Sequence, residues 1–342
     1  MSYLSTVIAR AVRVVMGRDG AAIFVLWLAA GAACAAEATA LRVNVFPGAA
    51  NLALFAGIDK GVFERRGLKV EVQFTPNSDQ QRKGLAEGAF EIAHAAVDNA
   101  VHMVEDARQD VIIVMGGDSS MNEFLVQPEI RSIAELRGRI IAVDAPNTAY
   151  ALLAKKILLK NGMREGRDYT VAPVGGAAGR MKAVVSDKQY AAVVLNVPWS
   201  ILAMQNGLKS LGRTVDLLGP YQASGAFVMR SWASANGPLL ERYMAAYLEA
   251  LRWVTDPANR SEGVALLVQR LKLAPEVAGQ TYDLLREPGF GLAPDARFDM
   301  EGFRNMLALR AEIEGQWGGR PPAPEKYIDL SYYERAMKAL AR

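Results

Sequence analysis

Two short stretches of this sequence place uncharged polar residues where a helix is expected to begin. Residues 44–61 read NVFPGAANLALFAGIDKG and residues 142–162 read AVDAPNTAYALLAKKILLKNG, each a strand end, a turn with proline and an apolar helix. The first turn of a helix has backbone N–H groups without helical partners, which favour an anion or another polar acceptor. Asn51, Asn147 and Thr148 are therefore predicted ligand contacts, although each could instead cap its helix.

Other turns of the same kind follow further strand-like segments. In open parallel sheets, ligands bind at the carboxyl ends of the strands, where loops lead into helices. Aromatic side chains near these turns offer flat faces for a ring in the ligand, or they pack at the edges of the fold. The predicted ligand-binding residues are Asn51, Asp98, Asn99, Ser119, Asn147, Thr148, Tyr150, Gly175, Gly176, Asn196, Trp199 and Tyr221.

The charged residues near these turns leave two ligand chemistries open. Arg180 follows the glycine-rich segment 174–179 and suits a carboxylate, a sulfonate or another oxyanion. Asp98, Asp118 and Asp144 stand at expected strand ends, and any of them that faces the ligand would favour an amine or a ring N–H. The sequence predicts either a small organic anion or a planar nitrogen heterocycle.

The residue types that metal binding or catalysis needs do not come together in the sequence. His94 and His102 are eight residues apart, which is not a metal-ligand spacing, and the single cysteine is Cys34. Ser119 stands beside Asp118, but no G-x-S-x-G segment surrounds it. The segment VGGAAGR lacks the Lys-Ser/Thr pair of a phosphate loop. We predict no catalytic residue, no metal and no cofactor.

The first 36 residues have the pattern of a cleaved export signal. Three arginines precede the apolar run AAIFVLWLAAGAACAA, which is shorter than the ~20 residues of a membrane-spanning helix. We expect cleavage near Ala35 or Ala36 and a periplasmic mature protein without cysteine. Lipidation of Cys34 is disfavoured, because Gly31 stands where a lipoprotein signal normally has a large aliphatic residue.

Composition is that of an ordinary globular protein. The chain has 342 residues, of which 22% are charged, and a formal net charge of +3. This length is sufficient for two domains of common size. The small net charge gives no reason to expect a nucleic-acid partner.

Alternating strand-like and helical segments predict an α/β fold of two doubly wound units. Apolar, β-rich segments such as LKVEVQF (68–74) alternate with helical ones, and the scheme begins again at RIIAVDA (139–145). The helices after residue 230 are expected to pack on the first unit. The second unit is then an insertion in the first, joined to it by crossing segments near 125–132 and 219–226. The predicted divisions are 1–36 for the signal peptide, 37–129 with 223–342 for lobe 1, and 130–222 for lobe 2.

Several segments resemble one family of transport proteins. GIDKGVFERRGLKVEV resembles the A-x-x-K-G-x-F-x-x-x-G-L-x-V stretch of the nitrate/taurine-type substrate-binding proteins of ABC transporters, which include sulfonate and thiamine-pyrimidine-precursor binders. IRSIAELRGRIIAVDAPNTAYALL resembles the I-x-S-x-x-D-L-x-G-K-x-I-A-V segment of these proteins, and YIDLSYYERAMKAL resembles their C-terminal helix. The resemblance extends over essentially the whole mature chain and implies the bilobed type II fold of periplasmic binding proteins.

The resemblance also implies a function without catalysis. The chain is expected to be the extracytoplasmic receptor of an ABC importer, which closes two lobes on its ligand and delivers it to a permease in the inner membrane. We expect a monomer. The alternative is a small-molecule enzyme on the same bilobed fold, similar to the thiamine-pyrimidine synthases, but those enzymes need a cysteine-rich motif and an active-site histidine that this sequence lacks.

Overall fold

The computed structural model describes residues 38–119 and 121–341 of the chain. The predicted signal peptide, its cleavage position and Cys34 lie outside these residues. The described part contains two five-stranded mixed sheets, both within one compact unit.

The first sheet combines early strands with one strand that returns from much later in the sequence. Its strands are β1 (Thr39–Val45), β2 (Leu68–Phe74), β3 (Ile92–Ala96), β4 (Val111–Gly116) and β10 (Ser224–Met229). They lie in the order β2-β1-β3-β10-β4, with β10 antiparallel to both of its neighbours. Strand β4, with the sequence VIIVMG, is buried along its whole length, as expected for an apolar strand that is covered on both faces.

The second sheet repeats this plan. Its strands are β5 (Asn122–Val126), β6 (Ile140–Val143), β7 (Thr170–Pro173), β8 (Tyr190–Asn196) and β9 (Lys209–Arg213). They lie in the order β7-β6-β8-β5-β9, and β5 is antiparallel to both of its neighbours. Each sheet thus has a parallel part built from strand–helix repeats and one antiparallel strand next to its edge strand.

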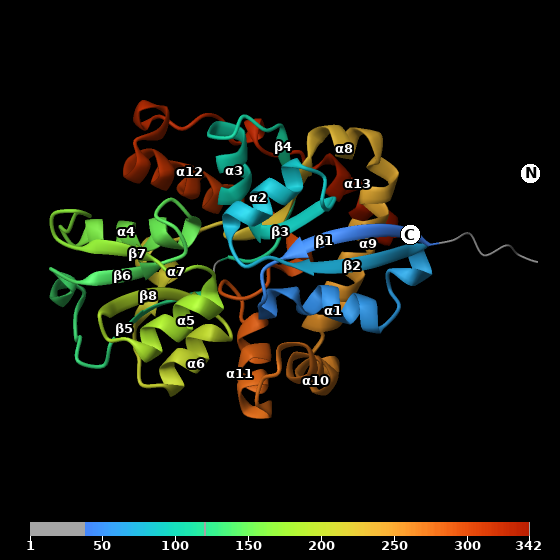
Figure 1. The fold of residues 1–342 in the computed structure, drawn as a ribbon. Coiled ribbons are helices and arrows are strands. Elements are labelled where there is room, and N and C mark those ends of the chain that lie inside the picture. Colours follow the sequence, from blue (N-terminus) through green and yellow to red (C-terminus); the bar gives the residue numbers. More distant parts are fainter. Residues whose placement is uncertain (1–37, 120, 342) are drawn as a thin grey trace, which may run out of the picture. The chain divides into compact units, whose positions relative to one another are not determined.

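Helices cover both sheets (Figure 1). Those that follow strands of the first sheet are α1 (Leu52–Asp59), α2 (Ser78–Ala86) and α3 (Asp98–Glu105). Those of the second region are α4 (Ala149–Lys160), α5 (Ala177–Ser186), α6 (Trp199–Gln205) and α7 (Thr214–Leu218). The C-terminal helices are α8 (Arg230–Ala235), α9 (Gly237–Thr255), α10 (Arg260–Leu271), α11 (Pro275–Leu285), α12 (Met300–Glu314) and α13 (Ser331–Leu340).

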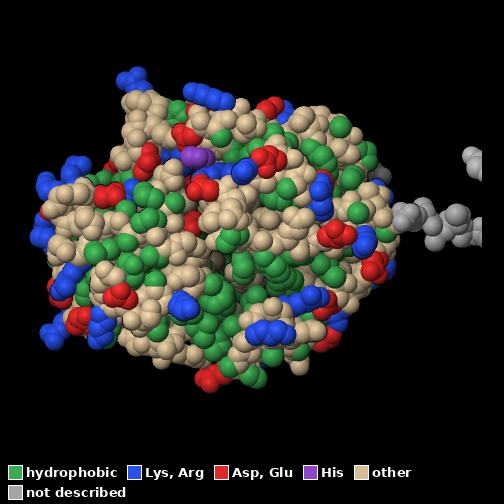
Figure 2. Space-filling model, in the orientation of Figure 1, with side chains coloured by type: hydrophobic (Ala, Val, Ile, Leu, Met, Phe, Trp, Pro, Cys, Tyr) green, Lys and Arg blue, Asp and Glu red, His purple; other side chains and the backbone are tan. Residues whose placement is uncertain are grey.

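The C-terminal helices complete the core beside the first sheet. Helix α9 buries Leu240, Tyr243, Tyr247 and Leu251, whose spacing of three or four residues puts them on one helical face. This face belongs to the same hydrophobic cluster as residues of α1 and β1. On the face of the molecule drawn in Figure 2, hydrophobic side chains gather over α1 and α11, and charged side chains lie mostly toward the margins.

The chain crosses between the two sheets twice, which confirms the predicted fold of two doubly wound α/β lobes. The first crossing lies between the end of β4 at Gly116 and the start of β5 at Asn122, and the second between Leu218 and Ser224. The first differs from the expected crossing near 125–132. Strand β5, expected in lobe 1, hydrogen-bonds to β8 and β9, and its Phe124 and Val126 are buried in the core of the second lobe.

The C-terminal helices do not contact the first lobe alone, as the sequence had suggested. Helix α12 also packs against α4 of the second lobe, where Leu152 belongs to one hydrophobic cluster with Phe303 and Leu307. On the same side, the ammonium group of Lys155 lies 3.5 Å from a carboxylate oxygen of Glu314. Apolar and ionic contacts therefore both join the lobes away from the crossing segments.

A buried ion pair fixes α12 against the start of α3. Arg310 Nη1 donates to Asp98 Oδ1 at 2.6 Å, and each of these side chains is only 1% exposed. Arg310 Nε also donates to Gln316 Oε1 at 2.8 Å. Burial alone would lower the pKa of Arg310, but the charges of Asp98 and Asp106 raise it above its ordinary value, so the guanidinium stays charged.

We predict that Asp98→Asn lowers the free energy of unfolding by about 3–5 kcal/mol, because it leaves the charge of Arg310 buried without its partner. The matched control is Asp283→Asn in the exposed Arg260–Asp283 pair, joined at 2.8 Å, where the loss should stay below ~1 kcal/mol. Urea unfolding followed by circular dichroism measures both. Equal losses in the two variants would show that the buried pair has no special weight.

Candidate ligand-binding site

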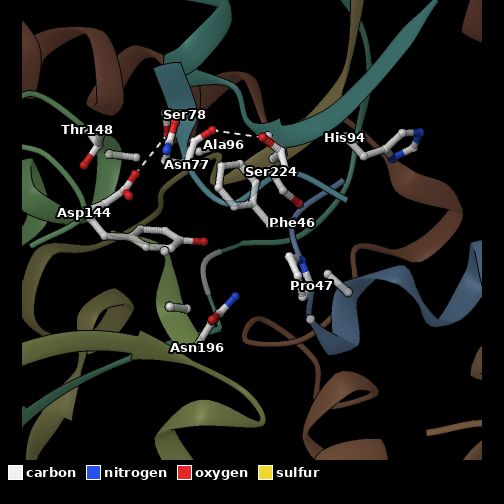
Figure 3. A pocket seen from close by; sticks show the side chains of 18 of the residues that line it. Phe46, Pro47, Asn77, Ser78, His94, Ala96, Asp144, Thr148, Asn196 and Ser224 are labelled. Atoms are coloured by element: carbon white, nitrogen blue, oxygen red, sulfur yellow. Dashed lines mark hydrogen bonds between the residues drawn. The ribbon is translucent and has the colours of Figure 1, made fainter. Parts of the chain in front are cut away.

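A cavity of about 520 Å³ is lined by turns from both lobes (Figure 3). Phe46 and Pro47 line it from the first lobe, and Asp144 and Asn196 line it from the second. This volume is in the usual range for a small-molecule site, ~300–1,000 Å³. It lies where the carboxyl ends of strands from both sheets lead into helices, as the sequence predicted for a ligand site.

Several helices begin at the cavity. The lining residues Ser78, Asn99, Ala149 and Ala177 belong to the first turns of α2, α3, α4 and α5. No side chain caps α4 or α5, so the first N–H groups of these helices are not taken by a capping side chain. Helix dipoles and N–H groups therefore favour acceptor atoms of a ligand at this end of the cavity.

Most of the predicted ligand-binding residues lie in the cavity wall, and the others do not. Those that line the cavity are Asn51, Asn99, Thr148, Tyr150, Gly175, Gly176 and Asn196. Those that do not are Asp98, Ser119, Asn147, Trp199 and Tyr221. A direct contact between any of them and a ligand stays a prediction.

The five residues outside the wall have other surroundings. Asp98 pairs with Arg310, and Tyr221 is 3% exposed within the core that contains Phe303. Trp199 packs against the core of the second lobe. Ser119 and Asn147 are half-buried turn residues. Proximity in sequence to a strand end was therefore not sufficient to bring these side chains to the cavity.

Asn51 and Thr148 use their side chains to hold their own turns. Asn51 Nδ2 donates to the carbonyl oxygen of Phe46 at 2.7 Å, and Thr148 Oγ1 donates to that of Ala145 at 2.9 Å. Neither side chain makes a capping hydrogen bond to its helix. Both residues thus shape the turns that present backbone N–H groups, a role between the two that the sequence suggested.

Other lining residues were not identified from the sequence. Asn77 and Ser78 belong to a strand–turn–helix unit of the same kind, and Asn77 Oδ1 accepts from Gln80 N at 2.9 Å as an ordinary cap. The spacing of this unit could have indicated them. Ser224 on β10 and Tyr247 on α9 come from elements far along the chain, and no local pattern marks them.

Arg180 is the cationic side chain among the described residues that line the cavity. It is 2% exposed, and its Nη1 donates to the carbonyl oxygen of Gly175 at 2.9 Å. Its Nε is buried without a hydrogen-bond partner, and its guanidinium carbon lies 5.6 Å from the ring centroid of Tyr150. Burial lowers the pKa of Arg180, while the charge of Asp144 acts in the opposite direction. Arg180 can donate to an acceptor in a bound ligand.

Two aspartates also line the cavity, one from each crossing region of the fold. Asp118 Oδ2 accepts a hydrogen bond from Ser224 Oγ within the first lobe. Asp144 Oδ2 accepts one from Ser78 Oγ at 3.0 Å, and this bond joins the second lobe to the first. The cavity therefore carries charges of both signs.

His94 on β3 contributes an uncharged ring. Its Nε2 lies 2.8 Å from the hydroxyl oxygen of Tyr243, and its ring centroid is 5.0 Å from that of Tyr247. Burial among these aromatic side chains lowers the pKa of His94 to about 3, so the ring is neutral at physiological pH.

Metal binding and membrane spanning were examined for the same part of the chain. Within residues 38–119 and 121–341, His, Cys, Asp and Glu side chains do not form a group of three or more that could hold a metal ion. None of the helices in these ranges is both long and apolar enough to cross a bilayer.

We predict that His94 makes folding stability pH-dependent. An unfolded histidine takes up a proton near pH 6.5, whereas the folded one resists it until about pH 3, so stability is lost as pH falls from 6.5 toward 3. His94→Gln should reduce the loss between pH 7 and pH 5 by about 2 kcal/mol. Tyr243→Phe, which keeps the imidazole, should preserve the wild-type pH dependence. Urea unfolding at the two pH values measures this, and an unchanged slope in His94→Gln would contradict it.

Known structures share this fold. A protein from Bordetella bronchiseptica RB50 is 20% identical, with a TM-score of 0.76 over 90% of this chain and 99% of that one. The periplasmic nitrate-binding protein NrtA from Synechocystis PCC 6803 is 15% identical, with a TM-score of 0.76 over 89% of each chain. The alkanesulfonate-binding protein SsuA from Xanthomonas axonopodis pv. citri, solved bound to MOPS, is 21% identical, with a TM-score of 0.67 over 82% of this chain and 94% of that one.

The sequence comparisons lead to a family. A search of curated proteins found no match. The model of the NMT1-like family matches residues 34–268, which is more than half of the chain. The family match and the likeness to nitrate- and alkanesulfonate-binding proteins together confirm the resemblance seen in the sequence. The chain belongs to the NMT1-like family.

Proposed function

We propose that this protein is the exported solute receptor of an ABC importer, which captures a small organic anion or a planar nitrogen heterocycle by closure of two lobes. The observation that carries the proposal is a cavity whose walls come from both lobes, at the carboxyl ends of both sheets. The similar structures named as nitrate- and alkanesulfonate-binding proteins support a binding role. A permease in the inner membrane, the periplasm and a monomeric state complete the proposal.

Contacts across the cleft have the character of a closed state. Ser78 Oγ donates to Asp144 Oδ2 at 3.0 Å between the lobes. A Cβ atom on Gly176 would lie 2.9 Å from the carbonyl oxygen of Pro76, so the backbones of the two lobes approach each other closely there. Bending at the crossing segments would separate these atoms. A ligand that contacts both walls stabilises the closed form by its differential affinity for it.

The walls divide the work of ligand recognition. Helix starts at Ala149 and Ala177 supply N–H groups, and Arg180 supplies a charged donor for an acceptor group. Phe46, Tyr150 and Tyr247 supply apolar and aromatic surface for a carbon skeleton or ring. This combination suits a small planar or short-chain solute with at least one acceptor group.

We propose that the protein binds without converting its ligand. His94, the histidine in the cavity wall, is neutral and hydrogen-bonded to Tyr243, so it is occupied in the core rather than poised beside a nucleophile. Binding and closure account for the arrangement of the cavity without a chemical step.

The test is binding and compaction by the mature protein. A thermal-shift screen of nitrate, alkanesulfonates, aromatic acids and aminopyrimidines identifies a binder, which stabilises by ~2.7 kcal/mol at 100 times its Kd. Small-angle scattering with that compound should then show a smaller radius of gyration. Conversion of the compound by purified protein, or tight binding without compaction, would contradict the proposal.

We predict that Gly176→Val weakens binding of that compound about tenfold, which corresponds to ~1.4 kcal/mol, because the new side chain meets Pro76 only when the lobes close. The melting temperature without the compound should change little. Gly48→Ala is the matched control, since a Cβ at this lining glycine has open space around it. Calorimetric titration measures both variants. Full affinity in Gly176→Val would show that binding does not need this approach of the lobes.

A further inference from the structure

Asp144 has one satisfied and one unsatisfied carboxylate oxygen. It follows β6 and lines the cavity, and its Oδ2 accepts from Ser78 Oγ at 3.0 Å (Figure 3). Its Oδ1 is buried and has no hydrogen-bond partner. A buried acceptor without a donor destabilises the state that contains it, so the closed cavity is incomplete at this atom.

A second unsatisfied acceptor lies on the neighbouring strand. Asn196 ends β8, which pairs in parallel with β6, so the carboxyl ends of the two strands lie at the same edge of the sheet. Asn196 lines the cavity from the same lobe as Asp144 (Figure 3), and its Oδ1 is also buried without a partner. Both atoms require hydrogen-bond donors, and two adjacent strands present them to the cavity.

The opposite requirement exists at Arg180. Its Nε is a buried donor without a partner, and Asp144 is near enough to affect its charge. The pair leaves little net charge on this wall but leaves unsatisfied atoms of both kinds. An ion that offers only acceptors, such as nitrate, would satisfy Arg180 and would set its oxygens against those of Asp144 and Asn196.

We propose that Asp144 is a specificity-determining residue that selects ligands with an N–H donor beside an acceptor group. The ligand class is a small molecule with an ammonium, amidine or ring-amino group next to a carboxylate, sulfonate or ring acceptor, rather than a simple oxyanion. This inference rests on the proposed receptor function. Because Oδ2 holds Ser78 of the other lobe while Oδ1 faces the ligand, the same carboxylate links donor recognition to closure.

The test compares matched probes that differ by one donor group. The pairs are taurine with ethanesulfonate, 4-(aminomethyl)benzoate with 4-methylbenzoate, and 2-aminopyrimidine with pyrimidine, and nitrate is an acceptor-only probe. Calorimetric titration of the mature protein should give at least tenfold tighter binding for the donor-bearing member of one or more pairs. Asp144→Asn should remove most of that difference, at least tenfold, and leave the affinity of the donor-free member within about threefold.

Two further variants separate selection from closure and from folding. Ser78→Ala removes the bond across the cleft but keeps the carboxylate, so it should weaken both members of a pair by the same factor. Asp216→Asn, an exposed aspartate in the same lobe, should change neither affinity. Thermal melts of all variants report whether they fold.

Three outcomes would overturn the inference: equal affinities within every pair, an unchanged ratio in Asp144→Asn, or no binding by any donor-bearing probe. Tight binding and compaction with ethanesulfonate or nitrate would leave the receptor function intact while rejecting donor selection. The two proposals therefore fail in different ways.

Discussion

The structure depends on one constraint: polar atoms at the meeting edges of two sheets are removed from water without receiving partners from the chain itself. Arg180 Nε, Asp144 Oδ1 and Asn196 Oδ1 are buried and unsatisfied at the wall of a single cavity. Elsewhere, buried polar groups such as Asp98 and Arg310 satisfy each other. A folded chain tolerates this imbalance where another molecule supplies the missing hydrogen bonds, and a cleft that can open lets water supply them until then.

The topology explains how two lobes share one site. Strand β10 returns from the second lobe into the interior of the first sheet and brings Ser224 to the cavity, where it donates to Asp118 beside the other crossing. Strand β5 runs antiparallel in the second sheet, so each crossing segment leads directly into a sheet interior. Movement of the lobes is thereby confined to short segments, while α12 and α4 keep a separate contact that must yield on opening.

The sequence was a good guide to local units and a poor guide to long-range partners. The strand–turn–helix repeats fixed the positions of Asn51, Thr148 and Gly176 in the cavity wall, because a helix start after a strand is a local event. Asp98 follows the same local rule, but its partner Arg310 lies 212 residues later and takes it into the core. Strand β5 was assigned to the wrong lobe for a similar reason, since its neighbours β8 and β9 come later in the chain.

The division between backbone and side-chain donors explains why the fold alone does not define the ligand. N–H groups at the starts of α4 and α5 follow from the strand–helix plan and are available in any chain that folds this way. They attract acceptors of every kind. Selectivity must then come from side chains at the strand ends, and here those side chains include two carboxylates beside Arg180. The same backbone that would hold a simple oxyanion in a related protein is, in this chain, set against acceptors that an oxyanion cannot satisfy.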